Sequence, residues 1–161
     1  MQPDFNLLIR EAIQLELNVG KLYMLFYRLL PEDAEFWWKL SLEEENHAAL
    51  LKTAQQMRAS RVEIPNEMLP PGLIELQKSN QMIISAMADF EKHPDRAKAF
   101  ELAHRIELSA GEAHYEEFMN GAVDSRIKEV FRKLNRDDLN HAQRIRQYMA
   151  ERQISIPYME G

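Results

Sequence analysis

The sequence contains no cysteine, and it has only 5 glycines and 7 prolines among 161 residues. The lack of cysteine excludes disulfide bonds, thiolate metal sites, rubredoxin-type iron and cysteine nucleophiles. No run of 18 apolar residues occurs, so we expect no transmembrane span. The segment Met1–Phe5 lacks the basic and then apolar pattern of a secretory leader, so we expect no signal peptide and a cytoplasmic protein.

An excess of basic residues is also missing. There are 26 Asp and Glu against 20 Lys and Arg, for a formal net charge of -6 at pH 7. This balance argues against a nucleic-acid-binding protein, which normally carries a basic patch or stripe. The hydrophobic share of 45% is typical of a folded chain rather than a disordered one. We therefore expect a single domain over residues 1–161, with no nucleic-acid or membrane partner.

Glycine and proline cluster at a few places, which leaves long uninterrupted segments. In these segments apolar residues recur in steps of three and four, which is the periodicity of a buried helix face. The predicted helices are Phe5–Leu30, Asp33–Ser60, Leu73–Lys92, Asp95–Asn120 and Val123–Gln153, and the proline-containing segment Arg61–Gly72 is a connection. We predict an all-α fold, namely a four-helix bundle of two antiparallel helix hairpins, with a long crossover that contains an extra helix.

Each of the four long predicted helices has an acidic residue in the middle of the apolar stripe that should face the core. In two of these helices a histidine follows three residues later, on the same face. The six residues are Glu16, Glu44 with His47, Glu107, and Asp138 with His141. Four ionised carboxylates buried together are very unfavourable unless cations lie among them. Two divalent metals would neutralise them, and di-iron and di-manganese bundles use this ligand set.

The candidate ligands fall within an internal repeat. Residues 16–23 align with residues 107–114, and residues 40–48 align with residues 134–142. The repeat predicts two similar hairpins, related by a pseudo-twofold axis, that each contribute three ligands to a pair of metal ions. Gly20 and Gly111 occupy the same repeat position, and a glycine inside a helix costs about 1 kcal/mol relative to alanine. We interpret them as points of close helix approach or as room for a ligand.

These motifs resemble the rubrerythrin-like branch of the ferritin-like superfamily. The residues that carry the resemblance are Glu16 with Tyr23, Glu44-Glu45-Asn46-His47, Glu107, and Asp138-Leu139-Asn140-His141. The resemblance implies a ferritin-like bundle with two Fe ions (Mn or Zn being possible) that reacts with peroxide or dioxygen as a homodimer or higher homo-oligomer. We expect the Tyr23 hydroxyl to hydrogen-bond and orient Glu16, the alternative being plain core packing. His114 would be a seventh ligand, a partner of a ligand, or a polar residue that fills the core.

The sequence departs from the family pattern at three positions. Asp138 replaces the usual glutamate, and its shorter side chain would change the metal distance or lower the affinity. His114 stands where a second tyrosine is expected, and Ala110 stands where rubrerythrins proper carry an extra glutamate that serves peroxidase chemistry. The alanine weakens the peroxidase assignment. Because the chain has no cysteine, it lacks a rubredoxin domain, and electrons would have to come from a separate donor protein.

The residues leave other functions open. A ferroxidase or iron-handling protein, for storage or delivery, and a di-manganese catalase-like enzyme share the same ligand logic. A non-enzymatic helical module with exposed acids is a third possibility. We expect Glu43, Glu45 and the basic residues of the last helix, including Lys133 and Arg144, to form a solvated face, and Trp38 is a candidate for a dimer interface.

Overall fold

The computed structural model describes residues 5–59, 72–112 and 125–155, and within these ranges it is all-helical. The elements are α1 (Phe5–Leu29), the 3-10 helix η1 (Pro31–Asp33), α2 (Ala34–Ala59), α3 (Gly72–Lys92), α4 (Arg96–Glu112) and α6 (Ser125–Glu151). The prediction of an all-α fold is confirmed. The C-terminal end of the predicted fourth helix and the turn at Gly121 lie outside the described residues.

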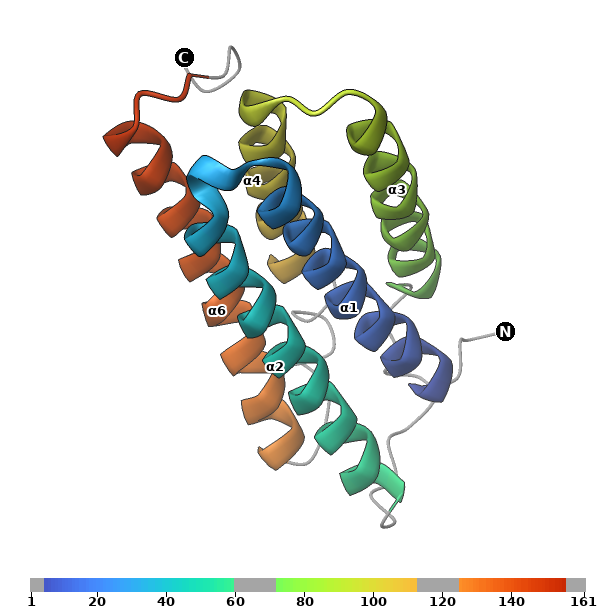
Figure 1. The fold of residues 1–161 in the computed structure, drawn as a ribbon. Helices are drawn as coiled ribbons and strands as arrows, with labels where there is room; N and C mark the ends of the chain where they lie inside the picture. Colours follow the sequence, from blue (N-terminus) through green and yellow to red (C-terminus); the bar gives the residue numbers. More distant parts are fainter. Residues whose placement is uncertain (1–4, 60–71, 113–124, 156–161) are drawn as a thin grey trace.

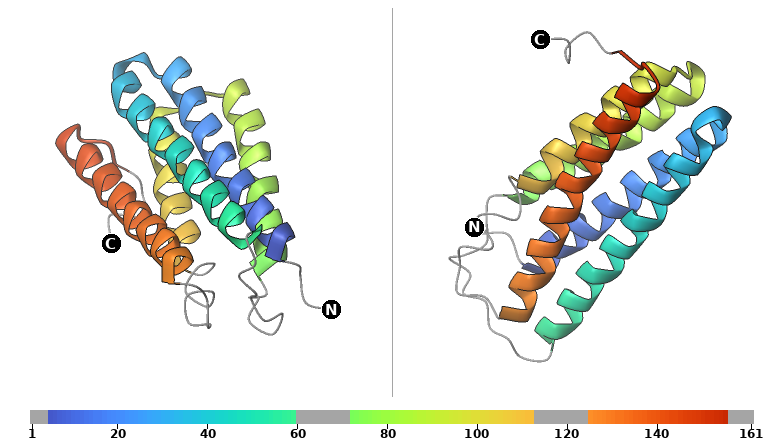
Figure 2. Two further views of the ribbon diagram at one scale, coloured as in Figure 1. Left: turned by 90° about the horizontal axis from the view of Figure 1, so that it is seen from below. Right: turned by 90° about the vertical axis from the view of Figure 1, so that its left-hand side faces the viewer.

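Two antiparallel helix pairs form the body of the molecule (Figures 1 and 2). Helix α1 packs along α2, helix α4 packs along α6, and the two pairs meet where α2 lies against α6. Helix α3 packs on the outside of α1 and runs back toward the end of the bundle where η1 lies. As a result α4 runs in the same direction as α2, which is the arrangement that a crossover with an extra helix produces.

The turn between α1 and α2 is fixed by a buried carboxylate. Pro31 begins η1, a position where proline needs no hydrogen-bonded N–H. Asp33, which is 1% exposed, accepts two hydrogen bonds of 2.8 Å from the Arg96 guanidinium and one of 2.8 Å from the Tyr148 hydroxyl. This single side chain therefore joins the start of α2 to the start of α4 and the end of α6.

Helix α3 is held on α1 by buried amides. Asn18 donates to the Asn80 side chain at 2.9 Å, and Asn80 donates to the carbonyl oxygen and to the carboxylate of Glu11. Since a buried amide without partners is costly, these bonds select one register for α3 along α1. No helix in the described part of the chain is long and apolar enough to cross a membrane.

Candidate metal centre

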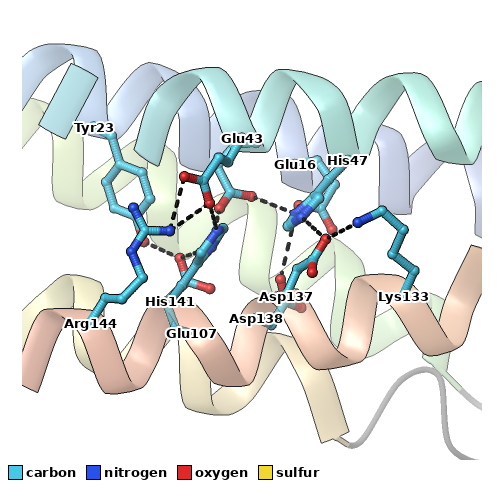
Figure 3. Close-up of polar contacts among 11 residues, drawn as sticks. Glu16, Tyr23, Glu43, His47, Glu107, Lys133, Asp137, Asp138, His141 and Arg144 are labelled. Atoms are coloured by element: carbon cyan, nitrogen blue, oxygen red, sulfur yellow. Dashed lines mark hydrogen bonds and ion pairs between the residues drawn. The ribbon is translucent and has the colours of Figure 1, made fainter. Parts of the chain in front are cut away.

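The six predicted ligands come together in the interior of the bundle, and each of them is at most 3% exposed. They come from all four long helices: Glu16 from α1, Glu44 and His47 from α2, Glu107 from α4, and Asp138 and His141 from α6. Figure 3 labels five of them, Glu16, His47, Glu107, Asp138 and His141, and shows their side chains pointing toward one another. Ligand atoms of Glu44, His47, Asp138 and His141 all lie within 4.8 Å of one another, and this buried group could hold metal ions.

The cluster has two halves, each arranged around the Nδ1 atom of one histidine. In the first half, His47 Nδ1 lies 3.5 Å from Glu16 Oε2 and 3.6 Å from Asp138 Oδ1. In the second half, His141 Nδ1 lies 3.4 Å from Glu107 Oε1. The two imidazole rings stack with centroids 5.3 Å apart. Each half thus contains one nitrogen ligand and at least one carboxylate of its own.

Glu44 connects the two halves. Its Oε2 lies 3.4 Å from His47 Nδ1, and its Oε1 lies 2.9 Å from His141 Nδ1. A carboxylate with one oxygen toward each half is placed to bridge two cations. Helix α1 passes next to this residue at Gly20, where an added Cβ atom would lie 3.4 Å from the Glu44 Cβ, at ordinary contact distance. The surroundings of Gly111 lie outside the described residues.

Several buried polar atoms of the cluster have no hydrogen-bond partner in the described part of the protein. They are Glu44 Oε1, Asp138 Oδ2, His47 Nδ1 and His141 Nδ1. Glu44 Oε1 and His141 Nδ1 lie 2.9 Å apart as an ion pair without hydrogen-bond geometry. Each such atom costs about 1–3 kcal/mol when left unsatisfied. A cation bound among them would remove this cost, so the residues present fit a metal centre.

The opposite nitrogen of each histidine contacts a carboxylate from the other helix. His141 Nε2 lies 2.6 Å from Glu43 Oε2, and His47 Nε2 lies 3.3 Å from Asp137 Oδ2. Because an ionised carboxylate only accepts hydrogen bonds, this contact assigns the ring proton to Nε2. The Nδ1 lone pair then remains available to a metal ion, which is the usual arrangement of metal-binding histidines.

Each of these outer carboxylates is paired with a cation (Figure 3). Arg144 donates to both oxygens of Glu43 at 2.9 and 2.7 Å, and Lys133 donates to Asp137 at 3.0 Å. The hydrogen bond from His141, together with Arg144, lowers the pKa of Glu43 to about 2. Both outer acids therefore stay ionised and continue to hold the histidine rings.

Lys133 is exposed, as expected, whereas Glu43 and Arg144 are half-buried, and the contact of Asp137 with His47 was not predicted. The signal was present in the repeat. An acid directly precedes the candidate ligand acid in both halves, as Glu43 before Glu44 and as Asp137 before Asp138. Only the packing of α2 against α6 shows that each outer acid reaches the histidine of the opposite helix.

Without a metal, protons take the place of the missing positive charge. Burial and the neighbouring Glu44 raise the pKa of Glu16 to about 7. Burial also raises the pKa of Asp138 well above its usual range, and the nearby acids add to this effect. Burial alone would lower the pKa of His47, but Glu16 and Glu44 raise it to about 11. The site therefore has a strong preference for positive charge.

Tyr23 has a different partner from the predicted one. Its hydroxyl donates to Glu107 Oε1 on α4 rather than to Glu16. Tyr23 lies two helical turns after Glu16 on α1, so its long side chain extends across the bundle instead of back along its own helix. Burial, together with the nearby Glu107, raises the pKa of Tyr23. His114 lies outside the described residues.

A groove of about 590 Å³ lies on the outer face of the cluster, between α2 and α6. His47, Glu43, Asp137 and Lys133 contribute to its lining. His47 therefore faces the cluster with its Nδ1 atom and lines the groove with the opposite side of its ring.

No protein-family model, no curated protein and no solved structure matches the chain.

Proposed function

We propose that this protein is a non-haem di-iron oxidoreductase of the rubrerythrin-like type that acts on peroxide or dioxygen. The observation that carries the proposal is the pair of inward-facing Nδ1 atoms, each with carboxylates around it, joined by the two oxygens of Glu44. Two cations of charge +2 would balance the four buried carboxylates. The ligand set of oxygen and imidazole nitrogen, without thiolate, suits iron or manganese and also accepts zinc.

Bound iron would supply reversible one-electron redox chemistry at a position that a small oxidant can reach. The chain's own residues would orient and tune the ligands. Glu43 and Asp137 fix the ring orientation and the tautomer of the two histidines. Tyr23 holds Glu107 by its hydrogen bond, and the apolar residues around the cluster keep out bulk water.

The proposal also includes an electron donor, an oligomeric state and a cellular location. Electrons would come from a separate donor protein, because the cysteine-free chain cannot hold a rubredoxin centre. Trp38 is 45% exposed while its neighbour Trp37 is fully buried, so Trp38 is the aromatic side chain that we assign to a contact between copies of a homodimer or higher homo-oligomer. A cytoplasmic location also belongs to the proposal.

The proposal is tested by anaerobic loading with Fe(II), followed by optical spectra before and after one equivalent of hydrogen peroxide. We expect a near-ultraviolet band to appear on oxidation and to bleach on reduction. The variant Glu44→Ala/His47→Ala should lose this band, and Glu45→Gln, an exposed position on the same helix, is the matched control. A spectrum that is unchanged in the double variant would favour the non-enzymatic helical module.

Two further outcomes would redirect the assignment. Iron oxidation that produces a large mineral-containing assembly in sizing chromatography would favour iron handling, since a dimer cannot enclose a mineral core. Oxygen release from peroxide by the manganese-loaded protein, but not by the iron-loaded protein, would favour a di-manganese catalase-like enzyme.

A further inference from the structure

Aromatic side chains connect the candidate metal centre with the end of the bundle where η1 lies. Three of these aromatic residues, Tyr23, Trp37 and Tyr148, have side chains that strong biological oxidants can oxidise by one electron. The phenylalanines between them cannot be oxidised in this way, but they fill the space between the oxidisable rings. The arrangement therefore has two ends, at Tyr23 beside the cluster and at Tyr148 near the surface.

The rings are in contact from one end to the other. The Tyr23 ring lies 5.5 Å from the Trp37 ring, centroid to centroid. From Trp37 one route passes through Phe36, with separations of 5.1 and then 4.1 Å to Tyr148. A second route passes through Phe100, with separations of 4.6 and then 5.4 Å. All these distances are within the range of direct aromatic packing.

Both tyrosines have a proton acceptor. The Tyr23 hydroxyl donates to Glu107, and the Tyr148 hydroxyl donates to Asp33 at 2.8 Å. An oxidised tyrosine is a strong acid, so a carboxylate in contact with the hydroxyl makes its oxidation easier by accepting the proton. Trp37 Nε1, in contrast, is buried and has no hydrogen-bond partner among the described residues. An electron vacancy on Trp37 therefore has no acceptor for its proton and moves on to a tyrosine.

Only the Tyr148 end is open to solvent. Tyr23 and Trp37 are 0% exposed, whereas Tyr148 is half-buried and lines a groove of about 450 Å³. Basic side chains (Lys39, Arg144, Arg152) and acidic side chains (Glu32, Asp33, Glu35, Glu151) both line this groove, and the Arg152 guanidinium lies 3.8 Å from the centroid of the Tyr148 ring. A small reductant can approach Tyr148 here but cannot reach the other two rings.

We infer that Tyr23, Trp37 and Tyr148 form a path for one-electron transfer between the buried centre and the groove at Tyr148. The inference rests on the proposed oxidoreductase function. Reduction of one hydrogen peroxide to two waters takes two electrons and two protons. Two ferrous ions can supply both electrons once. When both ions are ferric, the peroxide is reduced by two electrons taken from Tyr23 one at a time, and each time the vacancy on Tyr23 passes through Trp37 to Tyr148. At the groove, a one-electron reductant of the ascorbate class donates an electron to the oxidised Tyr148. Two such reductants are oxidised for each peroxide, and the aromatic residues are regenerated.

The experiment treats the iron-loaded, fully oxidised protein with hydrogen peroxide and freezes it rapidly for electron paramagnetic resonance. Peptide mass spectrometry of the same samples locates oxidised side chains. In the unaltered protein we expect a tyrosyl radical and oxidation at Tyr148, both lost when ascorbate is present. Tyr148→Phe keeps the ring contacts but lacks the hydroxyl, and it should shift oxidation to Trp37 or Tyr23. Trp37→Phe should abolish the radical at Tyr148 and leave one at Tyr23.

The matched control is Tyr27→Phe, which changes an exposed tyrosine on α1 outside the path. It should behave like the unaltered protein. An oxidation pattern that is the same in Tyr148→Phe as in the unaltered protein would overturn the path, and this variant decides the matter even if Trp37→Phe does not fold. Protein that binds no iron would instead overturn the proposed function itself, so the iron content is measured first.

Discussion

The histidines of the cluster owe their orientation to residues that do not face it. Glu43 and Asp137 each accept a hydrogen bond from the histidine of the opposite helix, and each is neutralised by a cation on α6. Such partners hold a metal-binding imidazole in one tautomer and one orientation. The properties of the candidate centre therefore depend on the contact between α2 and α6 as much as on the ligands.

Removing one of these outer carboxylates should weaken metal binding without removing a ligand. We expect Glu43→Gln to lower the affinity for Co(II) by about 10–100-fold, because Glu43 no longer carries the charge that supports His141. Competition with a chromophoric chelator measures this change. Glu129→Gln is the control, since Glu129 only forms an exposed ion pair with Arg132 on α6. Equal affinities for the two variants would contradict the role assigned to Glu43.

At the scale of elements, close helix approach and a few buried polar contacts position the ligands. Helix α1 passes next to Glu44 of α2 at Gly20, and the Asn18–Asn80 pair sets α3 on α1. The helices and their apolar faces could be predicted from the periodicity of the sequence, because helix burial leaves a strong signal. The partner of Tyr23 could not be predicted, since it depends on how far α1 lies from α4 and not on any spacing within one helix.

At position 20 a small side chain should be tolerated, whereas a large side chain should reduce metal binding. Gly20→Ala places a methyl group 3.4 Å from the Glu44 Cβ, which is an ordinary contact, and a helical alanine is favoured by about 1 kcal/mol over glycine. We expect this variant to keep both its thermal stability and its metal content. Gly20→Leu should push Glu44 aside and lower the metal content. Metal analysis and thermal denaturation of both variants provide the test, and full metal content in Gly20→Leu would contradict it.

The buried carboxylate at the end of the bundle should contribute strongly to stability. Asp33→Asn removes the charge that Arg96 contacts through two hydrogen bonds and leaves the Arg96 guanidinium with only its longer contact, 3.5 Å, to the exposed Glu32 carboxylate among the described residues. We expect a loss on the order of 2 kcal/mol, below the full value for a buried pair because Arg96 is 32% exposed. Urea denaturation measures the loss. Glu35→Gln, which disrupts an exposed ion pair with Lys39 on α2, should leave the urea midpoint nearly unchanged.

At the scale of the whole molecule, the acid excess of the chain is partly an interior property. Four of the 26 acidic residues belong to the buried cluster. Their position could be predicted because acids within an apolar stripe conflict with the rest of the pattern. The outer acids could not be recognised in the same way, since Glu43 and Asp137 resemble ordinary surface residues until the helix pairs are assembled.

The stability of the metal-free protein should fall as the pH rises, whereas the stabilisation that bound metal provides should increase. In the metal-free protein, the pKa of Glu16 is raised from 4.5 to about 7 and that of His47 from 6.5 to about 11. The folded state therefore binds more protons than the unfolded state between about pH 4.5 and 11, and its stability falls as the pH rises through this window. Metal ions displace these protons, so their apparent affinity increases with pH.

Thermal denaturation at pH 6 and pH 8.5, with and without Mn(II), measures this linkage. We expect the metal-free protein to melt at a lower temperature at pH 8.5 than at pH 6, and the increase on adding Mn(II) to be larger at pH 8.5. The Glu44→Ala/His47→Ala variant serves as the control and should show little increase at either pH. A metal-dependent increase that is larger at pH 6 would contradict the assigned protonation of the cluster.

The central claim is that the buried cluster binds a pair of metal ions, and metal quantification tests it most directly. The protein is purified without added metal, and its metal content per chain is measured beside that of Glu44→Ala/His47→Ala and Glu45→Gln. The account predicts two metal ions per chain in the unaltered protein and in Glu45→Gln, and a loss of bound metal in the double variant. Well under one metal ion per chain in the unaltered protein, or an unchanged content in the double variant, would contradict it.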